Sequence, residues 1–269
     1  MLAGDASKVG AAAPTNGGLL SVTTMNVQGL TRSRWGTEAD TLGPLLSGLC
    51  RCRTDVACLQ ELGLLSSDVP ELQSRCYTAG FTAFIAPLST VSQDLSTSSP
   101  SPSRPSASPL RRVLGHGTLI LIRNELAKYA ATVSCSLSHR LVAVRLFIRN
   151  VCRLIFVGIY APTGSSANVS AERRALLAGV RSIACDASAL SAKLIVLGDL
   201  NEVADPTIDA SPPLTVRRAT PLCDLLRSLM LQDTFRVICP QRTAITWQPP
   251  GRVLLGLPDA WTTYLLRPT

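Results

Sequence analysis

Several residue types that whole classes of protein depend on are scarce in this chain of 269 residues. Aromatic residues make up 4% and charged residues 16%, so leucine, valine, isoleucine and alanine must build the core. No apolar run reaches the ~18 residues that a membrane-spanning helix needs. Residues 1–18 also lack the continuous apolar segment of a signal peptide. We therefore expect an intracellular protein with no membrane partner.

Histidine and closely paired cysteine are scarce as well. The chain has two histidines, His116 and His139, and none of its nine cysteines belongs to a CxxC pair. Zinc sites and disulfide frameworks are usually built from clusters of such residues, so both are disfavoured. We expect reduced, mostly buried cysteines and histidines at surface or strand-edge positions.

Positive charge is what the chain has in excess. The net charge is +8 and the isoelectric point is near 9.3. This balance favours a polyanionic partner such as DNA, although an ordinary basic protein can have the same composition. Hydrophobic residues make up 46%, which is enough for one large domain or two small ones.

The composition changes twice along the chain. Residues 1–18 are small and polar and predict a flexible lead, followed by one domain over 19–269. Residues 88–112 are rich in serine and proline and cannot bury enough apolar surface to offset the entropy of ordering, so they predict a disordered insertion. Strand-like patterns resume directly after it. The insertion therefore interrupts one domain and does not separate two.

The rest of the domain mixes strands and helices. Strands are predicted over 19–30, 55–62, 117–124, 141–148, 153–162, 193–200 and 243–251, and helices over 37–52, 170–190 and 220–235, with a helix and then a strand over 71–87. Ser170 is a candidate N-cap of the helix over 170–190. We expect 117–124, 141–148 and 153–162 to be antiparallel neighbours in one sheet. The order predicts an α/β sandwich.

Polar side chains stand where four of these strands end. They are Asn26 and Gln28, Gln60 and Glu61, Asp199 and Asn201, and Tyr160. A strand that leaves the core for solvent accounts for any one of them. Four such strand ends together favour a functional site.

These residue types suit phosphodiester cleavage. A glutamate binds a hard divalent cation such as Mg²⁺, which prefers oxygen ligands, neutralises phosphate charge and stabilises a leaving oxygen. An aspartate aligns or activates a water molecule. Asparagine and tyrosine donate hydrogen bonds to phosphate oxygens.

Four segments carry a family resemblance, namely MNVQGL, CLQEL, IYAP and GDLNEV. Their order and approximate spacing resemble the endonuclease/exonuclease/phosphatase superfamily, which includes abasic-site DNA endonucleases, DNase I-like nucleases and the endonuclease domains of non-LTR retrotransposons. NVQGL and GDLN look most like the retrotransposon endonucleases. The resemblance spans roughly residues 19 to 265. It implies a DNase I-like α/β fold, a two-layer β-sandwich flanked by helices, with the site at one edge.

The resemblance also implies catalytic roles for particular residues. Asn26 would orient groups around the phosphate, and Tyr160 would contact the scissile phosphate. Asp199 would position or activate the attacking water, and Asn201 would help to bind the phosphate.

Metal and DNA contacts follow in the same way. Mg²⁺ or Mn²⁺ would be held mainly by Glu61, with Gln28 where some relatives have an acidic residue. That replacement keeps an oxygen ligand but removes a charge. Arg32, Arg34 and Trp35 are candidate DNA contacts, and a solvated basic loop accounts for them equally well.

The C-terminal part departs from the family pattern. Residues 244–247 (AITW) fit a family motif, and residues 258–266 stand where relatives have an Arg-x-Asp-Tyr strand, with Asp259 in the place of the aspartate. The family's final Ser-Asp-His motif is absent. We therefore expect a fold that lacks its last strand, with weak or no catalysis without that motif.

Three functions stay open at this stage. The first is a metal-dependent DNA endonuclease of a non-LTR retrotransposon, acting in the nucleus beside a reverse transcriptase domain of the same polyprotein. The others are a degenerate, non-catalytic nucleic-acid-binding module and a phosphatase of the same fold.

Overall fold

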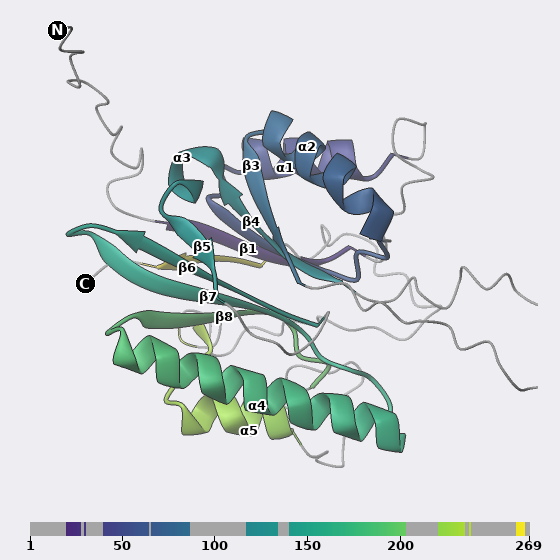
Figure 1. Cartoon of the computed structure of the whole chain (residues 1–269), viewed down its shortest axis with the longest axis vertical. Coiled ribbons are helices and arrows are strands. Elements are labelled where there is room, and N and C mark those ends of the chain that lie inside the picture. The colour runs from purple at the N-terminus through teal and green to yellow at the C-terminus, as the bar shows by residue number, and fades with distance from the viewer. Residues whose placement is uncertain are drawn as a thin grey trace, which may run out of the picture.

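The structure is a computed structural model, and two β-sheets packed face to face form its centre, with helices on both outer faces (Figure 1). It describes residues 20–27, 30, 40–64, 66–86, 117–133, 140–202, 220–234, 237 and 262–266. The arrangement confirms the predicted α/β sandwich. The expected flexible lead, the Ser/Pro-rich insertion and the predicted strand over 243–251 lie outside the described residues.

The first sheet has the strand order β3-β4-β2-β1-β9. Its strands are β1 (Leu20–Asn26), β2 (Val56–Gln60), β3 (Phe81–Ile85), β4 (Thr118–Arg123) and β9 (Thr262–Leu266). Strands β1 and β2 are parallel, and all other neighbours in this sheet are antiparallel. The helices α1 (Leu42–Arg51) and α2 (Val69–Thr78) cover its outer face, with a 3₁₀ turn (Ser66–Asp68) before α2.

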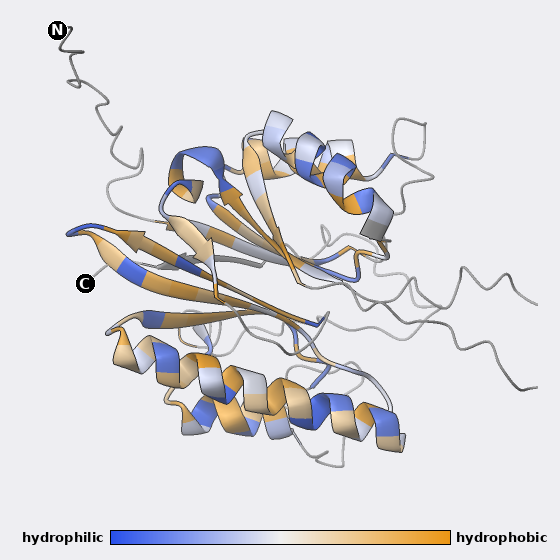
Figure 2. Cartoon of the chain, viewed as in Figure 1, coloured by the Kyte–Doolittle hydropathy of each residue, from blue (hydrophilic) through white to orange (hydrophobic). Residues whose placement is uncertain are grey.

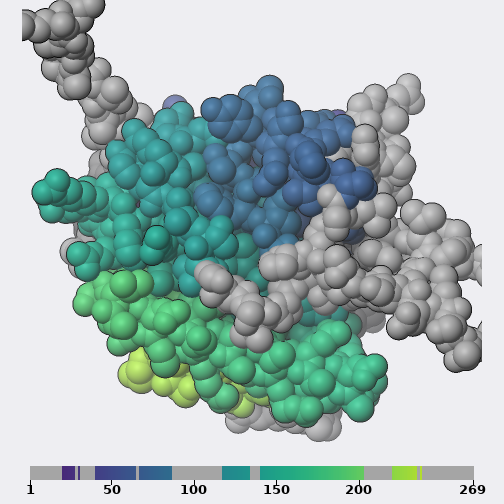
Figure 3. Space-filling view, in the orientation of Figure 1, coloured from purple at the N-terminus to yellow at the C-terminus, as the bar shows by residue number. Residues whose placement is uncertain are grey.

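The second sheet has the strand order β5-β6-β7-β8. Its strands are β5 (Ala130–Thr132), β6 (Leu141–Ile148), β7 (Cys152–Tyr160) and β8 (Lys193–Asp199), and a short helix, α3 (Asn124–Ala127), joins the two sheets. Only β7 and β8 are parallel. The helices α4 (Ala167–Ala189) and α5 (Pro221–Ser228) lie against its outer face. In Figure 3 the blue residues that include α2 lie in the upper part of the face shown, and the green residues that include α4 lie in the lower part.

One strand belongs to a different sheet from the one expected. Strands β6 and β7 are antiparallel neighbours as predicted, but β4 pairs with β2 and β3 in the first sheet. Both faces of β4 are buried: Leu119 and Leu121 pack toward the helices, and Ile120 and Ile122 pack toward the second sheet. A strand buried on both faces has no pattern that assigns it to a sheet.

The start of α4 also differs from the prediction. Ser166 is the N-cap, with extended backbone and a side-chain oxygen that accepts a hydrogen bond from Val169 N at 3.3 Å. Ser170 lies inside the first turn, where its N–H donates to the carbonyl oxygen of Ser166 at 2.9 Å. Several serines near a helix start offer the same cap chemistry, and the loop before the helix selects among them.

Apolar side chains fill the space between the layers, and the strands of both sheets are predominantly apolar (Figure 2). The residues between the sheets include Val56, Cys58, Ile120, Val144 and Phe156, all fully buried. Separate clusters join each sheet to its helices. The buried residues between the sheets fix one sheet against the other, so strand ends from both sheets stay close together.

The cysteines are less uniformly buried than expected. Among the described ones, Cys58, Cys76 and Cys223 are buried, Cys152 is intermediate, and Cys50, Cys52 and Cys185 are exposed. Both histidines lie outside the described residues. Across the described part of the chain, no helix combines the length and apolar character needed to cross a membrane.

Candidate functional site

Two pairs of parallel strands end at the same edge of the sandwich. In the first sheet Asn26 is paired with Gln60, and in the second sheet Tyr160 is paired with Asp199. All four residues occupy the carboxyl ends of their strands. The tertiary structure therefore brings the polar strand ends from both sheets to one site.

Glu61 lies at the centre of this site. It follows β2 directly and has left-handed backbone, with φ of 57°. Its Oε1 atom accepts hydrogen bonds from Asn26 Nδ2 at 2.8 Å and from the Tyr160 hydroxyl at 2.7 Å. Among the described residues, both of these bonds end on Oε1, which leaves Oε2 as an available oxygen ligand.

Asn26 joins two carboxylates that come from different sheets. The same Nδ2 atom that donates to Glu61 also donates to Asp199 Oδ2 at 3.1 Å. An amide nitrogen has two N–H bonds, one for each carboxylate. Asn26 therefore holds Glu61 and Asp199 close together and reduces the repulsion between them.

Asn201 connects the ends of β7 and β8. Its backbone N–H donates to Asp199 Oδ1 at 2.9 Å, and its Nδ2 donates to the carbonyl oxygen of Ala161 at 2.7 Å. Ala161 N in turn donates to the carbonyl oxygen of Asp199 at 2.8 Å. In this structure Asn201 orients Asp199 and the loop that follows Tyr160.

Gly198 permits the close approach of β8 to β7. Its φ is 130°, and a Cβ atom at this position would lie 1.9 Å from the carbonyl oxygen of Ile159. Any other residue would overlap the backbone of β7. The glycine thus places Asp199 directly beside Tyr160.

Tyr160 is buried, with 8% of its surface exposed. Burial raises the pKa of its phenol well above the ordinary value, and the hydrogen bond and negative charge of Glu61 raise this pKa further. The charge of Arg140 acts in the opposite direction. Tyr160 is therefore protonated at neutral pH and acts as a hydrogen-bond donor.

Of the ten residues predicted from the sequence to be catalytic, metal-binding or DNA-binding, five meet at this site, namely Asn26, Glu61, Tyr160, Asp199 and Asn201. The remaining five candidates, Gln28, Arg32, Arg34, Trp35 and Asp259, lie outside the described residues.

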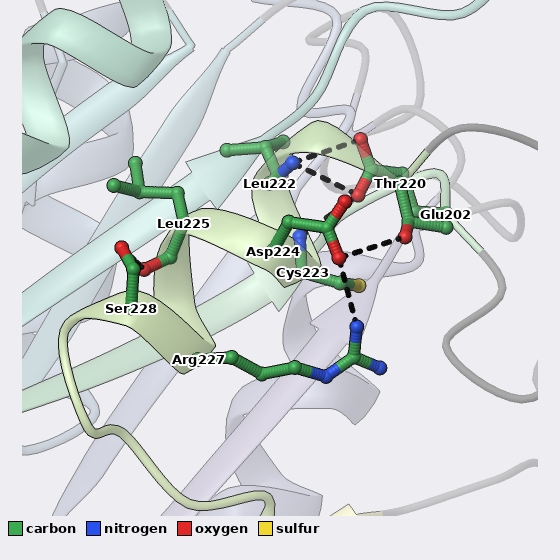
Figure 4. Close-up of polar contacts among 8 residues, drawn as sticks. All are labelled: Glu202, Thr220, Leu222, Cys223, Asp224, Leu225, Arg227 and Ser228. Atoms are coloured by element: carbon green, nitrogen blue, oxygen red, sulfur yellow. Dashed lines mark hydrogen bonds and ion pairs between the residues drawn. The ribbon is translucent and has the colours of Figure 1, made fainter.

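Sequence reasoning missed a role for Glu202, which directly follows Asn201. Its two carboxylate oxygens accept hydrogen bonds from Leu222 N at 3.1 and 3.0 Å, and Oε2 also accepts one from Cys223 N at 2.9 Å (Figure 4). The carboxylate therefore caps the first turn of α5. The carboxylate and these amides are 20 and 21 residues apart in the sequence, so no local cap pattern reveals the contact.

Solved structures with the same fold include two AP endonucleases. The enzyme LMAP from Leishmania major has 17% identity and a TM-score of 0.57, with 83% of this chain and 71% of that chain covered. The enzyme from Archaeoglobus fulgidus has 16% identity and a TM-score of 0.56, with 87% and 79% covered. At these identities the likeness establishes the fold.

A weaker likeness is to the endonuclease domain of TRAS1, a telomere-specific non-LTR retrotransposon. It has 13% identity and a TM-score of 0.44, with 78% of this chain and 70% of that chain covered. At that TM-score the likeness does not bear on the origin of this chain. No curated protein sequence gives a significant match.

The strongest evidence of relationship comes from a family model. The model of the Endonuclease/Exonuclease/phosphatase family matches residues 23–259, which is most of the chain and includes every described site residue. The fold, the order of the motifs and the meeting of their polar residues at one edge agree with this match. The chain therefore belongs to the Endonuclease/Exonuclease/phosphatase family.

Proposed function

We propose that this protein is a divalent-metal-dependent endonuclease that hydrolyses phosphodiester bonds in DNA. The observation that carries the proposal is the cluster of Glu61, Asp199, Asn26 and Tyr160, which two sheets build together at the ends of their parallel strands. The net charge of +8 favours a polyanionic substrate.

The donor set fits a hard cation such as Mg²⁺ or Mn²⁺. Glu61 offers Oε2 as a carboxylate ligand, and Mg²⁺ takes few protein ligands and keeps several waters. The described residues contain no group of three or more acidic, histidine or cysteine side chains that could hold a metal. When bound, the ion would neutralise phosphate charge and stabilise the leaving oxygen.

Asp199 is the residue best placed to position the attacking water. Donors fix both of its oxygens, Asn26 at Oδ2 and Asn201 N at Oδ1. This fixed carboxylate can accept a hydrogen bond from water and orient it for attack.

Hydrogen-bond donors at the site would contact phosphate oxygens as their charge grows in the transition state. Tyr160 offers a protonated hydroxyl, and the amide of Asn201 has a second N–H beside the one given to Ala161. Such donors act strongly in a site that water has left.

The origin of the chain is a separate part of the proposal. The resemblance of NVQGL and GDLN to retrotransposon endonucleases supports a non-LTR retrotransposon source. A reverse transcriptase domain of the same polyprotein and a nuclear site of action go with that origin.

A plasmid-nicking assay tests the proposed activity. The full chain is incubated with supercoiled plasmid and Mg²⁺ or Mn²⁺, with EDTA as the blank. We expect metal-dependent nicking that is weak, because the family's final Ser-Asp-His motif is absent. This nicking should fall ~10²–10³-fold further in Glu61→Gln and Asp199→Asn. The matched control is Glu125→Gln, because Glu125 is an exposed carboxylate on α3, beyond the opposite end of β4. Its nicking rate should equal that of the unchanged protein.

Other outcomes separate the competing functions. DNA binding in a mobility-shift assay without nicking in either metal would support a non-catalytic binding module. Phosphate release from small phosphoesters without plasmid nicking would support a phosphatase. Nicking that both site variants retain would rule out this cluster as the active site.

A further inference from the structure

The guanidinium of Arg140 lies over the face of the Tyr160 ring, and Arg140 directly precedes β6. Only 6% of this arginine is exposed, and its guanidinium carbon lies 5.2 Å from the centre of the tyrosine ring. Its backbone oxygen also accepts a hydrogen bond from Tyr160 N at 2.9 Å. The two residues are thus joined through both backbone and side chain.

Glu172 on α4 holds the guanidinium in this place. Arg140 Nε donates to Glu172 Oε2 at 2.8 Å, and 43% of the glutamate side chain is exposed. An arginine is seldom buried unless it is paired. Here the pair links the helix layer to the tyrosine that reaches into the site.

The contact between cation and ring restricts the orientation of the ring. A guanidinium within about 6 Å of a ring centre is attracted to the face of the ring, and the attraction grows when water is excluded. At the edge of the ring, the Tyr160 hydroxyl donates a hydrogen bond to Glu61 Oε1 at 2.7 Å. The ring is therefore held by a cation at its face and by an acceptor at its hydroxyl.

We propose that Arg140 is a positioning residue, which fixes the ring of Tyr160 so that its hydroxyl stays directed into the site. Arg140 acts through Tyr160 and does not itself touch the substrate. The consequence for catalysis rests on the proposed endonuclease function, whereas the effect on the ring is a property of the protein alone.

Strand β6, which begins directly after Arg140, supplies a matched control. Arg145 on β6 lies 5.9 Å from the ring centre of Phe147, but it is exposed and five residues further along the chain. Arg145→Met therefore removes an arginine above a ring without disturbing the site. Arg140→Met removes the buried one, and Arg140→Lys keeps its charge but loses the planar fork.

The first measurement needs neither metal nor substrate. Ring signals of labelled tyrosine are recorded by NMR on the full chain in EDTA and assigned to Tyr160 with Tyr160→Phe. In Arg140→Met the Tyr160 signals should shift and show faster ring flips, while those of Tyr129 stay unchanged. Arg145→Met should leave Tyr160 unchanged. Unaltered Tyr160 signals in folded Arg140→Met would overturn the proposal.

The second measurement is plasmid nicking. We expect Arg140→Met to lower kcat by ~10–100-fold with little change in KM, because a small displacement of a group that contacts the reacting atoms slows the chemical step. Arg140→Lys should recover part of the loss, and Glu172→Gln should cause a smaller one. A higher KM with unchanged kcat would instead indicate direct phosphate contact and contradict the proposal.

The two measurements fail independently. If the protein without substitutions does not nick DNA, the proposed endonuclease function is wrong, but the NMR test of the Tyr160 ring can still be carried out. If Arg140→Met does not fold by circular dichroism, Arg140→Lys and Glu172→Gln supply the same ring measurement. Unchanged ring signals in both of those variants would overturn the proposal.

Discussion

The hydroxyl of Tyr160 donates a hydrogen bond to Glu61 Oε1 at 2.7 Å, although the two residues lie at the ends of strands in different sheets. Asn26 makes a second connection of this kind, to Asp199. The site therefore lies at the joint between the sheets, and it is correctly assembled only when the two sheets pack in one register.

Asn26→Asp should make stability depend on divalent metal. The change removes the donor that bridges Glu61 and Asp199 and places a third carboxylate within about 3 Å of both, so repulsion should cost about 2 kcal/mol without metal. Thermal unfolding with and without Mg²⁺ measures this. Mg²⁺ should raise the Tm of Asn26→Asp more than that of Asn26→Ala, which adds no charge. Equal Mg²⁺ effects in the two variants would contradict the bridging role.

Gly198→Ala should destabilise the protein far more than a glycine change made in open space. A Cβ atom at position 198 would lie 1.9 Å from the carbonyl oxygen of Ile159. We therefore expect the free energy of unfolding to fall by more than about 4 kcal/mol. Gly80 also has positive φ, at 92°, but nothing lies within 4 Å of the position that a Cβ atom would take there. Gly80→Ala should therefore cost only about 1–2 kcal/mol. Urea unfolding of both variants separates steric overlap from backbone strain.

Glu202→Ala should loosen the start of α5. The change removes the acceptor of the N–H groups of Leu222 and Cys223, which should cost about 1–2 kcal/mol. Hydrogen exchange of those two amides should become faster. The control is Asp224→Ala, which breaks an exposed pair with Arg227 (Figure 4) and should cost less than about 1 kcal/mol. Unchanged exchange at both amides in Glu202→Ala would show that the cap does not stabilise the helix.

Thr118→Val should be neutral or stabilising, by up to about 1 kcal/mol. Thr118 is fully buried, and its hydroxyl oxygen has no hydrogen-bond partner among the described residues. Replacing that oxygen by a methyl group of similar size removes an unsatisfied polar atom. Thr23→Val is the comparison, because the Thr23 hydroxyl is hydrogen-bonded to that of Thr54 at 3.3 Å. Urea unfolding should rank Thr118→Val above Thr23→Val, and the reverse order would mean that the Thr118 hydroxyl is satisfied.

Cys58 should make the protein less stable at high pH. Burial raises the pKa of this thiol from 9.0 to about 12. As the pH rises, the thiol of the unfolded chain loses its proton before the buried thiol of the folded chain does. The contribution of Cys58 to the free energy of unfolding is therefore fully present below pH 9 and is lost as the pH rises toward 12, by ~1.4 kcal/mol per pH unit. Urea unfolding between about pH 8 and pH 11 should show this slope reduced in Cys58→Ala. The slope of stability against pH should be unchanged in Cys185→Ala, because Cys185 is exposed.

The amino-acid sequence alone was enough to predict the class of the fold and the positions of the polar side chains at the strand ends. Strand length, apolar patterning and turn residues are local properties, so the strands that end at Asn26, Gln60, Tyr160 and Asp199 could be recognised one by one. The order of the motifs then indicated the family, which the family match confirms.

Which of these elements meet depends on tertiary packing, which the sequence pattern does not reveal. Whether β4 joins the first or the second sheet depends on packing between layers, because both of its faces are apolar. The bridge from Asn26 to Asp199, the cap from Glu202 to α5 and the contact of Arg140 with Tyr160 each join residues distant in sequence. Hydrogen bonds and charges act over a few ångströms of space, and sequence spacing does not record those distances once the chain has folded.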